Sequence, residues 1–268
     1  GIYLNGEDIT GMKPFEINRK GLSRSFQVTN IFHRLSVYEN LRCAVLWSLG
    51  YRYSFWHLLG GQRALNEETD RLLERLNLQS RRNVLAGLLS YAEQRALEIG
   101  ITIAGGASVI LLDEPTAGMS RSETAQVVEL VRRVEQAADV VILLCSGTFS
   151  LACRVPLLLP GRLLTAAARV VAGERPIAVF TPEALQVKPQ QLRWRNAGLN
   201  PVVYFASPYQ PTDFRLLGAR ARVEGAKLVV LDCLGYTCRM KAEVAATSAV
   251  PVLLVRSLTA RIAAELVS

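Results

Sequence analysis

Two kinds of chemically useful side chain follow short apolar runs in this sequence. Asp113 and Glu114 come directly after the run at 109–112, whereas Cys145 and Cys233 each stand at the end of a comparable run. Apolar runs of this length predict buried strands, and parallel α/β sheets bind ligands at the carboxyl ends of their strands. A carboxylate at such a place can do chemistry or simply belong to a solvated turn, and an ionised thiol can take up a proton.

Small and hydroxyl-bearing residues follow both cysteines, at 146–148 after Cys145 and at 235–237 after Cys233. Such turns let backbone N–H groups approach a carboxylate, so a small carboxylate substrate could be held beside a thiol. Ser207 and Tyr209 could line the same cleft. Asp232 lies between a strand and Cys233, where a capping or hydrogen-bonding role competes with catalysis.

Free cysteine is often a small, buried and unreactive residue in folded proteins. That alternative stays open for Cys145 and Cys233, and we expect it for Cys43, Cys153 and Cys238. None of the cysteines forms a C-x-x-C pair, and only two histidines occur in the chain. The spacing therefore argues against a zinc site, and a chain of this size with few cysteines argues against a disulfide scaffold.

The elements that must position these residues alternate between strands and helices. Beyond the runs at 109–112 and 140–145, strands are expected at 177–180, 202–205, 228–231 and 252–255, and helices at 214–224, 240–247 and 258–267. This alternation predicts an α/β fold whose parallel sheets are covered on both faces. The apolar positions Leu72, Leu73 and Leu76 are spaced as the buried stripe of a helix.

The chain has 268 residues and a net charge of +8, most of it after residue 137. The arginines are scattered and lack the interleaved aromatics of RNA-binding modules, so no nucleic-acid partner is expected. No run approaches the length of a membrane span, and no secretory signal is evident. We expect a cytoplasmic protein. The first residue is Gly1, so the sequence is expected to begin inside a longer reading frame.

Four motifs occur in order in the first half of the chain. They are GIYLNGEDIT at 1–10, RSFQ with LSVYENL at 24–41, LSYAEQR at 89–95 and VILLDEPT at 109–116. This part resembles the ATP-binding subunits of ABC transporters, in particular those of branched-chain amino-acid importers. The resemblance covers about residues 1–136 and implies an ancestral role in ATP-driven amino-acid import.

The resemblance implies specific roles for five residues. Asp113 would help to hold Mg²⁺ and Glu114 would polarise the attacking water, as a catalytic residue. Gln27 of the Q-loop would reach both the metal and that water. Ser90 and Glu93, in the signature motif, would face the nucleotide, with the Ser90 hydroxyl offered to a γ-phosphate that a second subunit holds. ATP and Mg²⁺ are thus the cofactors implied, by resemblance only.

Three features of that family are missing from the sequence. No G-x-x-x-x-G-K-[ST] phosphate loop occurs among the 268 residues, and no histidine follows the run at 140–145. Tyr91 and Ala92 stand where the family has a glycine, and a Cβ there would crowd a phosphate. We therefore predict that this module by itself neither binds nor hydrolyses ATP, because the loop supplies the N–H groups and lysine that hold the phosphates.

The second half carries a different set of motifs. They are VVILLCSGTF at 140–149, ASPY at 206–209, LDCLGYT at 231–237 and PVLLVRSLTA at 251–260. This part resembles the AroM family, which is similar to aspartate, glutamate and hydantoin racemases. The resemblance implies cofactor-independent chemistry in which Cys145 and Cys233 act as an acid/base pair on a small carboxylate.

The sequence thus predicts two incomplete parallel-sheet modules, at 1–137 and 138–268, joined near residue 137. Three hypotheses remain open. The chain is a fusion or chimera that cannot hydrolyse ATP alone, a non-hydrolysing subunit that docks on a transporter, or an AroM-like protein with isomerase-type chemistry. The second hypothesis implies a membrane permease and a second ATPase subunit as partners, at the inner face of the plasma membrane. The aromatic cluster Tyr51, Tyr53, Phe55 and Trp56 could contact such a permease.

Overall fold

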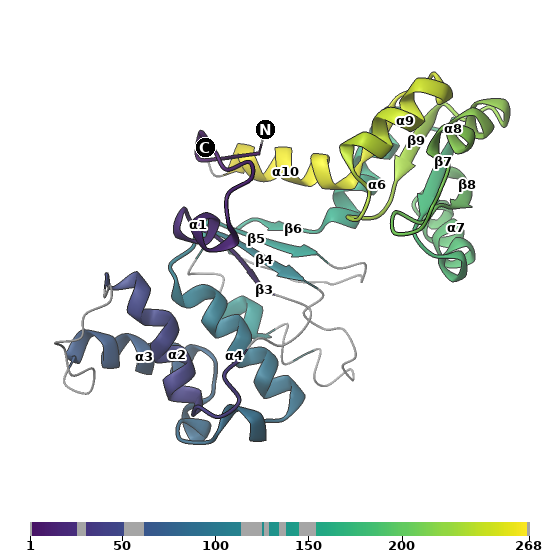
Figure 1. Cartoon of the computed structure of the whole chain (residues 1–268). Helices are drawn as coiled ribbons and strands as arrows, with labels where there is room; N and C mark the ends of the chain where they lie inside the picture. The colour runs from purple at the N-terminus through teal and green to yellow at the C-terminus, as the bar shows by residue number, and fades with distance from the viewer. Residues whose placement is uncertain are drawn as a thin grey trace. The chain divides into compact units, whose positions relative to one another are not determined.

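The chain divides into two compact units. The computed structural model describes residues 2–25, 31–50, 62–113, 125, 129–133, 138–144 and 154–266. The first unit comprises Gly1–Leu158 and Ala264–Ser268, and the second comprises Leu159–Ala263 (Figure 1). Each unit contains its own parallel sheet.

The first unit begins with a small antiparallel hairpin. Strands β1 (Tyr3–Leu4) and β2 (Glu7–Asp8) pair across a two-residue turn. The turn residues Asn5 and Gly6 both have positive φ, at 50° and 78°. Asn-Gly is the dipeptide that tolerates this geometry, because a two-residue hairpin turn needs positive φ at both positions. Helix α1 (Pro14–Arg19) follows and begins with proline, whose fixed φ suits the first position of a helix.

A four-stranded parallel sheet forms the centre of the first unit. Its strand order is β3-β4-β5-β6, with the bounds β3 Leu22–Ser25, β4 Val109–Asp113, β5 Val140–Leu144 and β6 Leu157–Leu158. Strand β4 is paired along its whole length with β5, from Val109 opposite Val140 to Asp113 opposite Leu144. The carboxyl ends of β3 and β4 therefore lie next to each other, with Ser25 opposite Leu112.

The first unit also contains helices. They are α2 (Val37–Ser48), α3 (Arg63–Arg75) and α4 (Tyr91–Ala104), with short 3₁₀ turns at Gln79–Arg81 and Ala86–Leu88. Helix α2 packs against both α3 and α4, and α4 packs against β3 and β4. The predicted buried stripe is confirmed, because Leu72, Leu73 and Leu76 are all at most 4% exposed.

The strand at 140–144 belongs to the first unit. The sequence placed it at the start of the second module, but β5 pairs with β4 in the sheet of the first unit. The compact units divide between Leu158 and Leu159, beyond residue 137. Because β5 supplies neighbours for both β4 and β6, no break in packing occurs at residue 138. The join near residue 137 stays a prediction about the origin of the two parts.

The second unit is built on another four-stranded parallel sheet, of order β10-β9-β7-β8. The strands are β7 Pro176–Thr181, β8 Asn200–Phe205, β9 Leu228–Leu231 and β10 Val252–Leu254. The helices between and around them are α6 Pro160–Ala172, α7 Val187–Asn196, α8 Phe214–Val223, α9 Cys238–Ser248 and α10 Val255–Leu266. A short 3₁₀ turn at Ala184–Gln186 precedes α7.

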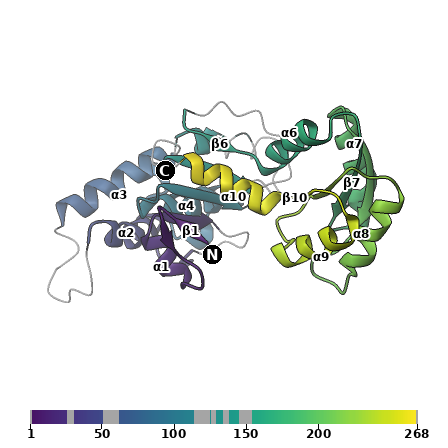
Figure 2. The ribbon, with the colours of Figure 1, turned by 90° about the horizontal axis from the view of Figure 1, so that it is seen from above.

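Alternate residues of the central strands enter two separate cores. Phe180 and Leu231 pack with Phe214 of α8 and Val244 of α9. Their strand neighbours face the other way, where Val179 and Val230 pack with Leu164 of α6 and Trp194 of α7. This is the period-two alternation of a strand. The second unit is therefore a layered α/β structure whose sheet is covered on both faces (Figure 2).

The predicted fold class is confirmed. Both units are α/β with parallel sheets, and the expected elements at 109–112, 228–231, 214–224 and 240–247 appear with shifts of one or two residues at their ends. Helices α6 and α7 were not predicted. No helix in the described ranges is long and apolar enough to cross a membrane.

The crossing of α8 over α9 gives a test of this packing. A Cβ at Gly218 would lie 2.4 Å from the Thr247 Oγ1 atom and 2.7 Å from the Val244 carbonyl oxygen. We predict that Gly218→Ala lowers the free energy of unfolding by about 1–3 kcal/mol, because backbone must move to relieve the overlap. The measurement is urea unfolding followed by circular dichroism.

Gly161→Ala is the matched control in the same unit. Its Cβ would meet nothing closer than an Arg193 nitrogen at 3.6 Å, and the position is in the first turn of α6. Alanine there should leave stability unchanged or raise it by about 0.4–1 kcal/mol through a smaller entropy of the unfolded chain. Equal effects of the two substitutions would contradict the close helix crossing.

Candidate functional site

The predicted site residues fall into three groups. Gln27, Glu114 and Cys145 lie outside the described residues, as does the aromatic cluster at 51–56. Asp113, Ser90 and Glu93 lie in the first unit. Cys233 lies in the second unit. The nucleotide-related residues and the thiol thus belong to separate compact units.

Asp113 ends strand β4 and is held by three groups of its own unit. The Arg24 guanidinium, from the neighbouring strand β3, forms an ion pair with the Asp113 carboxylate. The Asp113 N–H donates to the Ser25 Oγ atom at 3.3 Å, and its carbonyl oxygen accepts from Arg95 at 2.5 Å. The side chain of Asp113 keeps one fifth of its surface exposed. Its oxygens suit Mg²⁺ chemically, but one of them is paired with a cation.

Arg95 links this strand end to helix α4. Its guanidinium also donates to Glu98 at 2.6 Å, and both side chains are at most 5% exposed. A buried, hydrogen-bonded charge pair is costly to break because the remaining partner would be left unneutralised. The pair therefore fixes the position of the β4 end relative to α4.

Ser90 and Glu93 form the N-terminal cap of α4. The Ser90 Oγ atom accepts from the Glu93 N–H at 3.3 Å, and the Glu93 carboxylate accepts from the Ser90 N–H at 2.9 Å. This reciprocal pair is a capping box. Arg81 adds an ion pair to Glu93 at 2.7 Å. Burial opposes ionisation of Glu93, but the hydrogen bonds from Arg81 and Ser90 outweigh it and lower the pKa of Glu93.

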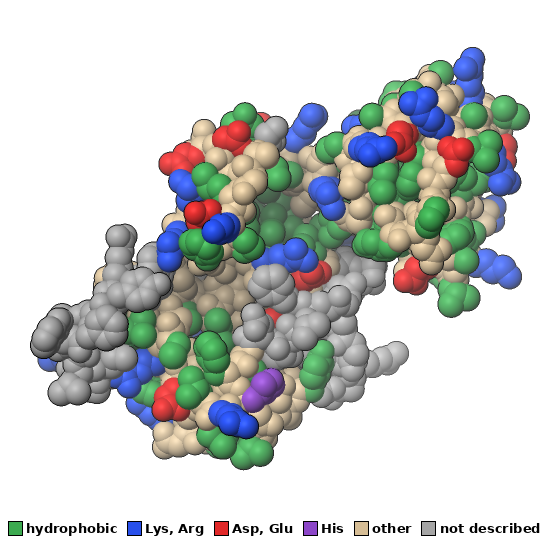
Figure 3. All heavy atoms as spheres, in the orientation of Figure 1, with side chains coloured by type: hydrophobic (Ala, Val, Ile, Leu, Met, Phe, Trp, Pro, Cys, Tyr) green, Lys and Arg blue, Asp and Glu red, His purple; other side chains and the backbone are tan. Residues whose placement is uncertain are grey.

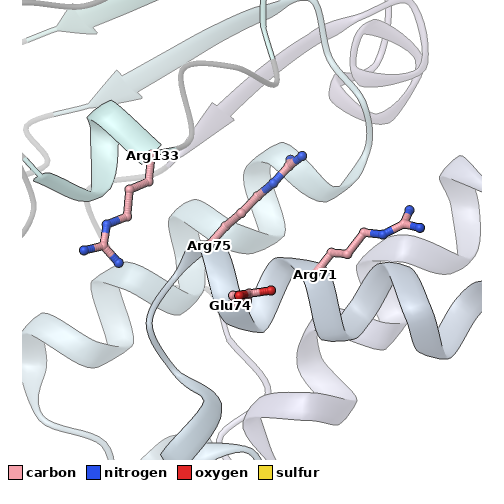
Figure 4. Close-up of a pocket in the computed structure, with 4 residues that line it drawn as sticks. All are labelled: Arg71, Glu74, Arg75 and Arg133. Atoms are coloured by element: carbon pink, nitrogen blue, oxygen red, sulfur yellow. The ribbon is translucent and has the colours of Figure 1, made fainter.

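Two of the hollows among the described residues lie in the first unit. One, of about 310 Å³, lies beside the Arg24–Asp113 pair, and the residues that give it polar side chains are Asn18, Ser23, Arg24, Ser25, Glu98 and Thr102. The other, of about 340 Å³, is lined by Arg71, Glu74, Arg75 and Arg133. In Figure 4, Arg71 and Arg75 point to one side and Arg133 points to another. Arg71 and Arg133 are each paired with an acidic neighbour on their own helix face. They do not form a convergent anion site.

Within the part of the chain that the structure describes, no three His, Cys, Asp or Glu side chains could hold a metal ion together. The predicted metal ligands were Asp113 and Gln27, and Gln27 lies outside that part. On the face that Figure 3 displays, the Lys and Arg side chains are interspersed with hydrophobic and acidic ones. The expectation of no nucleic-acid partner stays a prediction.

Cys233 stands at the carboxyl end of β9 and is half-buried. Its Sγ atom accepts a hydrogen bond from the Gly235 N–H at 3.3 Å. Burial raises the pKa of Cys233, and the nearby Asp232 charge adds to this. Hydrogen bonds from Gly235 and Tyr209 and the charge of Arg256 act in the opposite direction but do not outweigh burial. The raised pKa favours the neutral thiol of Cys233.

Asp232 has a hydrogen-bonding role, one of the two alternatives that the sequence left open. Its carboxylate accepts from Trp194 Nε1 at 3.2 Å and pairs with Arg193 at 3.2 Å, both from α7. Burial raises the pKa of Asp232, while Arg193 and Trp194 act to lower it. Because its side chain is only 7% exposed, this carboxylate ties α7 to the end of β9. Neither Arg193 nor Trp194 was predicted from the sequence.

The loop after β8 lies against the loop after β9. Tyr236 donates to the Ala206 carbonyl oxygen at 2.6 Å, and the Tyr209 N–H donates to the Ser207 Oγ atom at 3.2 Å. Ser207 is 5% exposed, so it is buried in the loop and does not line an open cleft as proposed. Arg256, at the start of α10, donates to the Leu234 carbonyl oxygen and brings a cation near the thiol.

The expectation of buried cysteines is wrong at two positions. Cys43 on α2 and Cys238 at the start of α9 are both exposed. Cys43 borders a polar hollow, and Cys238 follows the helix cap Thr237, so neither lies on a buried stripe. Cys153 lies outside the described residues.

Two family models match the chain. The model described as ABC transporter matches residues 1–117. The model described as AroM protein matches residues 104–267, which is more than half of the chain, and the two matches share residues 104–117. Together with the relatives described next, they show that the chain belongs to the ABC transporter family through its first part and to the AroM family through its second.

Curated relatives support the first assignment. The high-affinity branched-chain amino acid transport ATP-binding protein LivG of Escherichia coli (strain K12) is 30% identical over 197 residues, covering 72% of this chain and 74% of LivG. BraF of Pseudomonas aeruginosa, which bears the same description, is 28% identical over 202 residues, with the same shares. Alignments that cover 72% of this chain necessarily extend past residue 137.

Solved structures are similar over a smaller share. A dimeric ATP-binding cassette, MJ0796 bound to ADP and Pi, has a TM-score of 0.44 and 17% identity, and this chain covers 62% of it. The ADP conformation of the cassette MJ1267 has a TM-score of 0.42 and 21% identity, and this chain covers 57% of it. The chain thus spans about six tenths of these structures.

The capping box gives a pH-dependent test. Since the pKa of Glu93 is lowered on folding, its contribution to stability is complete above the ordinary glutamate pKa of about 4.3 and is lost as the pH falls through the lower folded pKa. We predict that Glu93→Gln lowers the free energy of unfolding at pH 7 by roughly 1 kcal/mol or less, and that the difference from wild type shrinks below about pH 4.

The measurement is urea unfolding at pH 7 and at pH 3.5. Glu74→Gln is the matched control, because Glu74 is also a helical glutamate but the described residues offer its side chain no hydrogen-bond or ion-pair partner. A Glu93→Gln difference that is the same at both pH values would contradict the role of the Glu93 charge.

Proposed function

We propose that the chain is a fusion of an ABC-transporter ATP-binding module with an AroM module, and that the first module neither binds ATP tightly nor hydrolyses it by itself. Both families are present in the chain. The observation that carries the second statement is the lack of any G-x-x-x-x-G-K-[ST] loop among the 268 residues. Without its N–H groups and lysine, nothing cradles the β- and γ-phosphates.

The Arg24–Asp113 pair supports this proposal but does not decide it. Arg24 is about half exposed, and exposed ion pairs contribute only about 0–1 kcal/mol. A bound Mg–nucleotide could displace Arg24 at that cost. The missing phosphate contacts weigh more, because each charge-assisted hydrogen bond is worth about 1.5–3 kcal/mol. Ser90 and Glu93, already engaged in the helix cap, could then act only on a nucleotide that another subunit holds.

The partners and the location follow from the same family. The relatives' names describe ATP-binding proteins of branched-chain amino acid transport. We propose that a module of this kind would work with a membrane permease and a second ATPase subunit, at the inner face of the plasma membrane. Two alternatives therefore remain. The chain is either a fusion with no role in transport or a non-hydrolysing subunit that docks on a transporter.

Isothermal titration of the whole chain with Mg–ATP tests the proposal. We expect no saturable heat up to millimolar nucleotide and no phosphate release above the buffer rate, because the phosphate contacts are missing. Micromolar affinity would contradict it. Asp113→Asn is the control variant, since any weak heat that depends on the metal should disappear in it, whereas heat from non-specific binding should remain.

A second candidate function is thiol-dependent proton transfer on a small carboxylate. The observation that favours it is the position of Cys233 at a strand end, with a backbone N–H on its sulfur and Arg256 nearby. In this chemistry the thiolate takes the proton from the carbon beside the carboxylate and becomes a thiol, and a second group returns a proton to that carbon. The racemase-like resemblance assigns the second role to Cys145, which stays a proposal.

Deuterium uptake at the α-carbon of small amino and hydroxy acids, followed by NMR in D₂O, tests this candidate. We predict that uptake is lost in Cys233→Ala and in Cys145→Ala, because each removes one of the two proton carriers. Cys43→Ala, an exposed cysteine in the other unit, should exchange at the wild-type rate. Wild-type exchange in Cys233→Ala would exclude Cys233 from the reaction.

A further inference from the structure

Two hydrogen-bond donors lie at the thiol of Cys233. The Gly235 N–H donates to Sγ at 3.3 Å, and the Tyr209 hydroxyl, which lies against Gly235, acts on the thiol as a hydrogen-bond donor that lowers its pKa. The two donors come from different places in the sequence, since Gly235 follows β9 and Tyr209 follows β8. From the sequence, Tyr209 was expected only to line a cleft.

Gly235 leaves the space in which the phenol group lies. A Cβ at position 235 would be 2.4 Å from the Tyr209 Oη atom, 2.8 Å from its Cζ atom and 3.0 Å from the Pro208 Cγ atom. Gly235 does not have a positive φ, so its backbone is open to other residues. The glycine is therefore required here for space, and what occupies the space is the hydroxyl end of Tyr209.

The loop that carries Tyr209 is fixed by buried contacts. Its N–H donates to the Ser207 Oγ atom, and the Thr212 hydroxyl donates to the Ser207 carbonyl oxygen at 2.9 Å. The Tyr236 hydroxyl, in a fully buried side chain, donates to the Ala206 carbonyl oxygen. The ring of Tyr209 itself is 77% exposed. A fixed backbone thus presents an accessible phenol at the sulfur.

We propose that Tyr209 is a positioning residue for Cys233, whose hydroxyl, admitted by Gly235, donates to the sulfur and stabilises its thiolate form. This inference rests on the proposed thiol chemistry for its biological meaning. It assigns to the second unit a reactive group that consists of Cys233, Gly235 and Tyr209, all between residues 159 and 263.

The charged and titratable groups around the sulfur act in opposite directions on the thiolate form of Cys233. Burial and the Asp232 carboxylate act against the thiolate, whereas Gly235, Tyr209 and Arg256 act for it. These groups come from the ends of β8 and β9 and from α10, and Asp232 is itself paired with Arg193 of α7. The pKa of Cys233 is raised in balance, so loss of one donor should raise it further.

The test is the pH dependence of alkylation of Cys233 by iodoacetamide in the whole chain, quantified on the Cys233 peptide by mass spectrometry. Alkylation follows the thiolate fraction. We expect Tyr209→Phe to shift the midpoint upward by about one pH unit, so that alkylation below the midpoint is about tenfold slower. Gly235→Ala should cause a similar shift, because its Cβ displaces the hydroxyl while the backbone N–H remains.

Tyr3→Phe, an exposed tyrosine of the first unit, is the control and should leave the profile unchanged. Circular dichroism checks that each variant is folded. If Gly235→Ala unfolds the unit, the result for Tyr209→Phe decides the test by itself. An unchanged midpoint in Tyr209→Phe, or faster alkylation at every pH, would overturn the inference, since the ring would then only shield the sulfur.

The alkylation experiment and the deuterium-uptake experiment test the two proposals separately. Alkylation requires no substrate, so a shifted midpoint without deuterium uptake would support the role of Tyr209 and contradict the proton-transfer function. Deuterium uptake that depends on Cys233, together with an unchanged midpoint, would support the function and contradict the role of Tyr209.

Discussion

Burial of both faces of a parallel sheet is the constraint on which the second unit depends. Parallel strands need crossover connections, and these place helices on the two faces. Alternate residues of β7 and β9 accordingly pack into two cores, one beneath α8 and α9 and the other beneath α6 and α7. The same connections bring the carboxyl ends of all four strands to one edge. The loops that carry Tyr209, Asp232 and Cys233 meet there for that reason.

In the first unit the polar groups at the strand ends are bound to one another. Asp113 is paired with Arg24, and its carbonyl oxygen is held by Arg95, which is itself paired with buried Glu98. Ser90 and Glu93 satisfy the first turn of α4. These contacts stabilise the ATP-binding family's scaffold without any ligand. Side chains that the family would use on a nucleotide therefore also stabilise the fold of this chain.

The thiol site shows opposing electrostatic effects at short range. Burial and Asp232 favour the neutral thiol of Cys233, and two hydrogen-bond donors with one cation favour the thiolate. Asp232 is tolerated beside the thiol because Arg193 and Trp194 of α7 neutralise and hydrogen-bond it. A buried carboxylate without them would cost several kcal/mol. The helix α7 thus supports the site although none of its residues touches the sulfur in the described contacts.

The sequence by itself determined the fold class, the position of most strands and the two families. Strands that are buried on both faces appear as continuous apolar runs, and the family motifs are short segments of sequence. It also predicted the buried stripe of α3 and the placement of Cys233 at a strand end. It did not predict α6 and α7. The polar residues of α7 give a weak helical pattern, whereas α6 has a buried stripe at Leu164, Ala168 and Ala172 that was missed in the sequence. Likewise, the exposure of Cys43 and Cys238 depends on neighbours that are distant in the chain.

Only the tertiary structure decided which residues meet. The strand at 140–144 has the apolar character that either sheet could bury, and its pairing with β4 places it in the first unit. Arg24 and Asp113 are brought together by strand pairing across 89 positions. Arg193 and Trp194 reach Asp232 because α7 packs against the sheet that contains β9. Tyr209 reaches the sulfur because position 235 lacks a side chain. Such contacts depend on non-local packing, which local residue patterns do not encode.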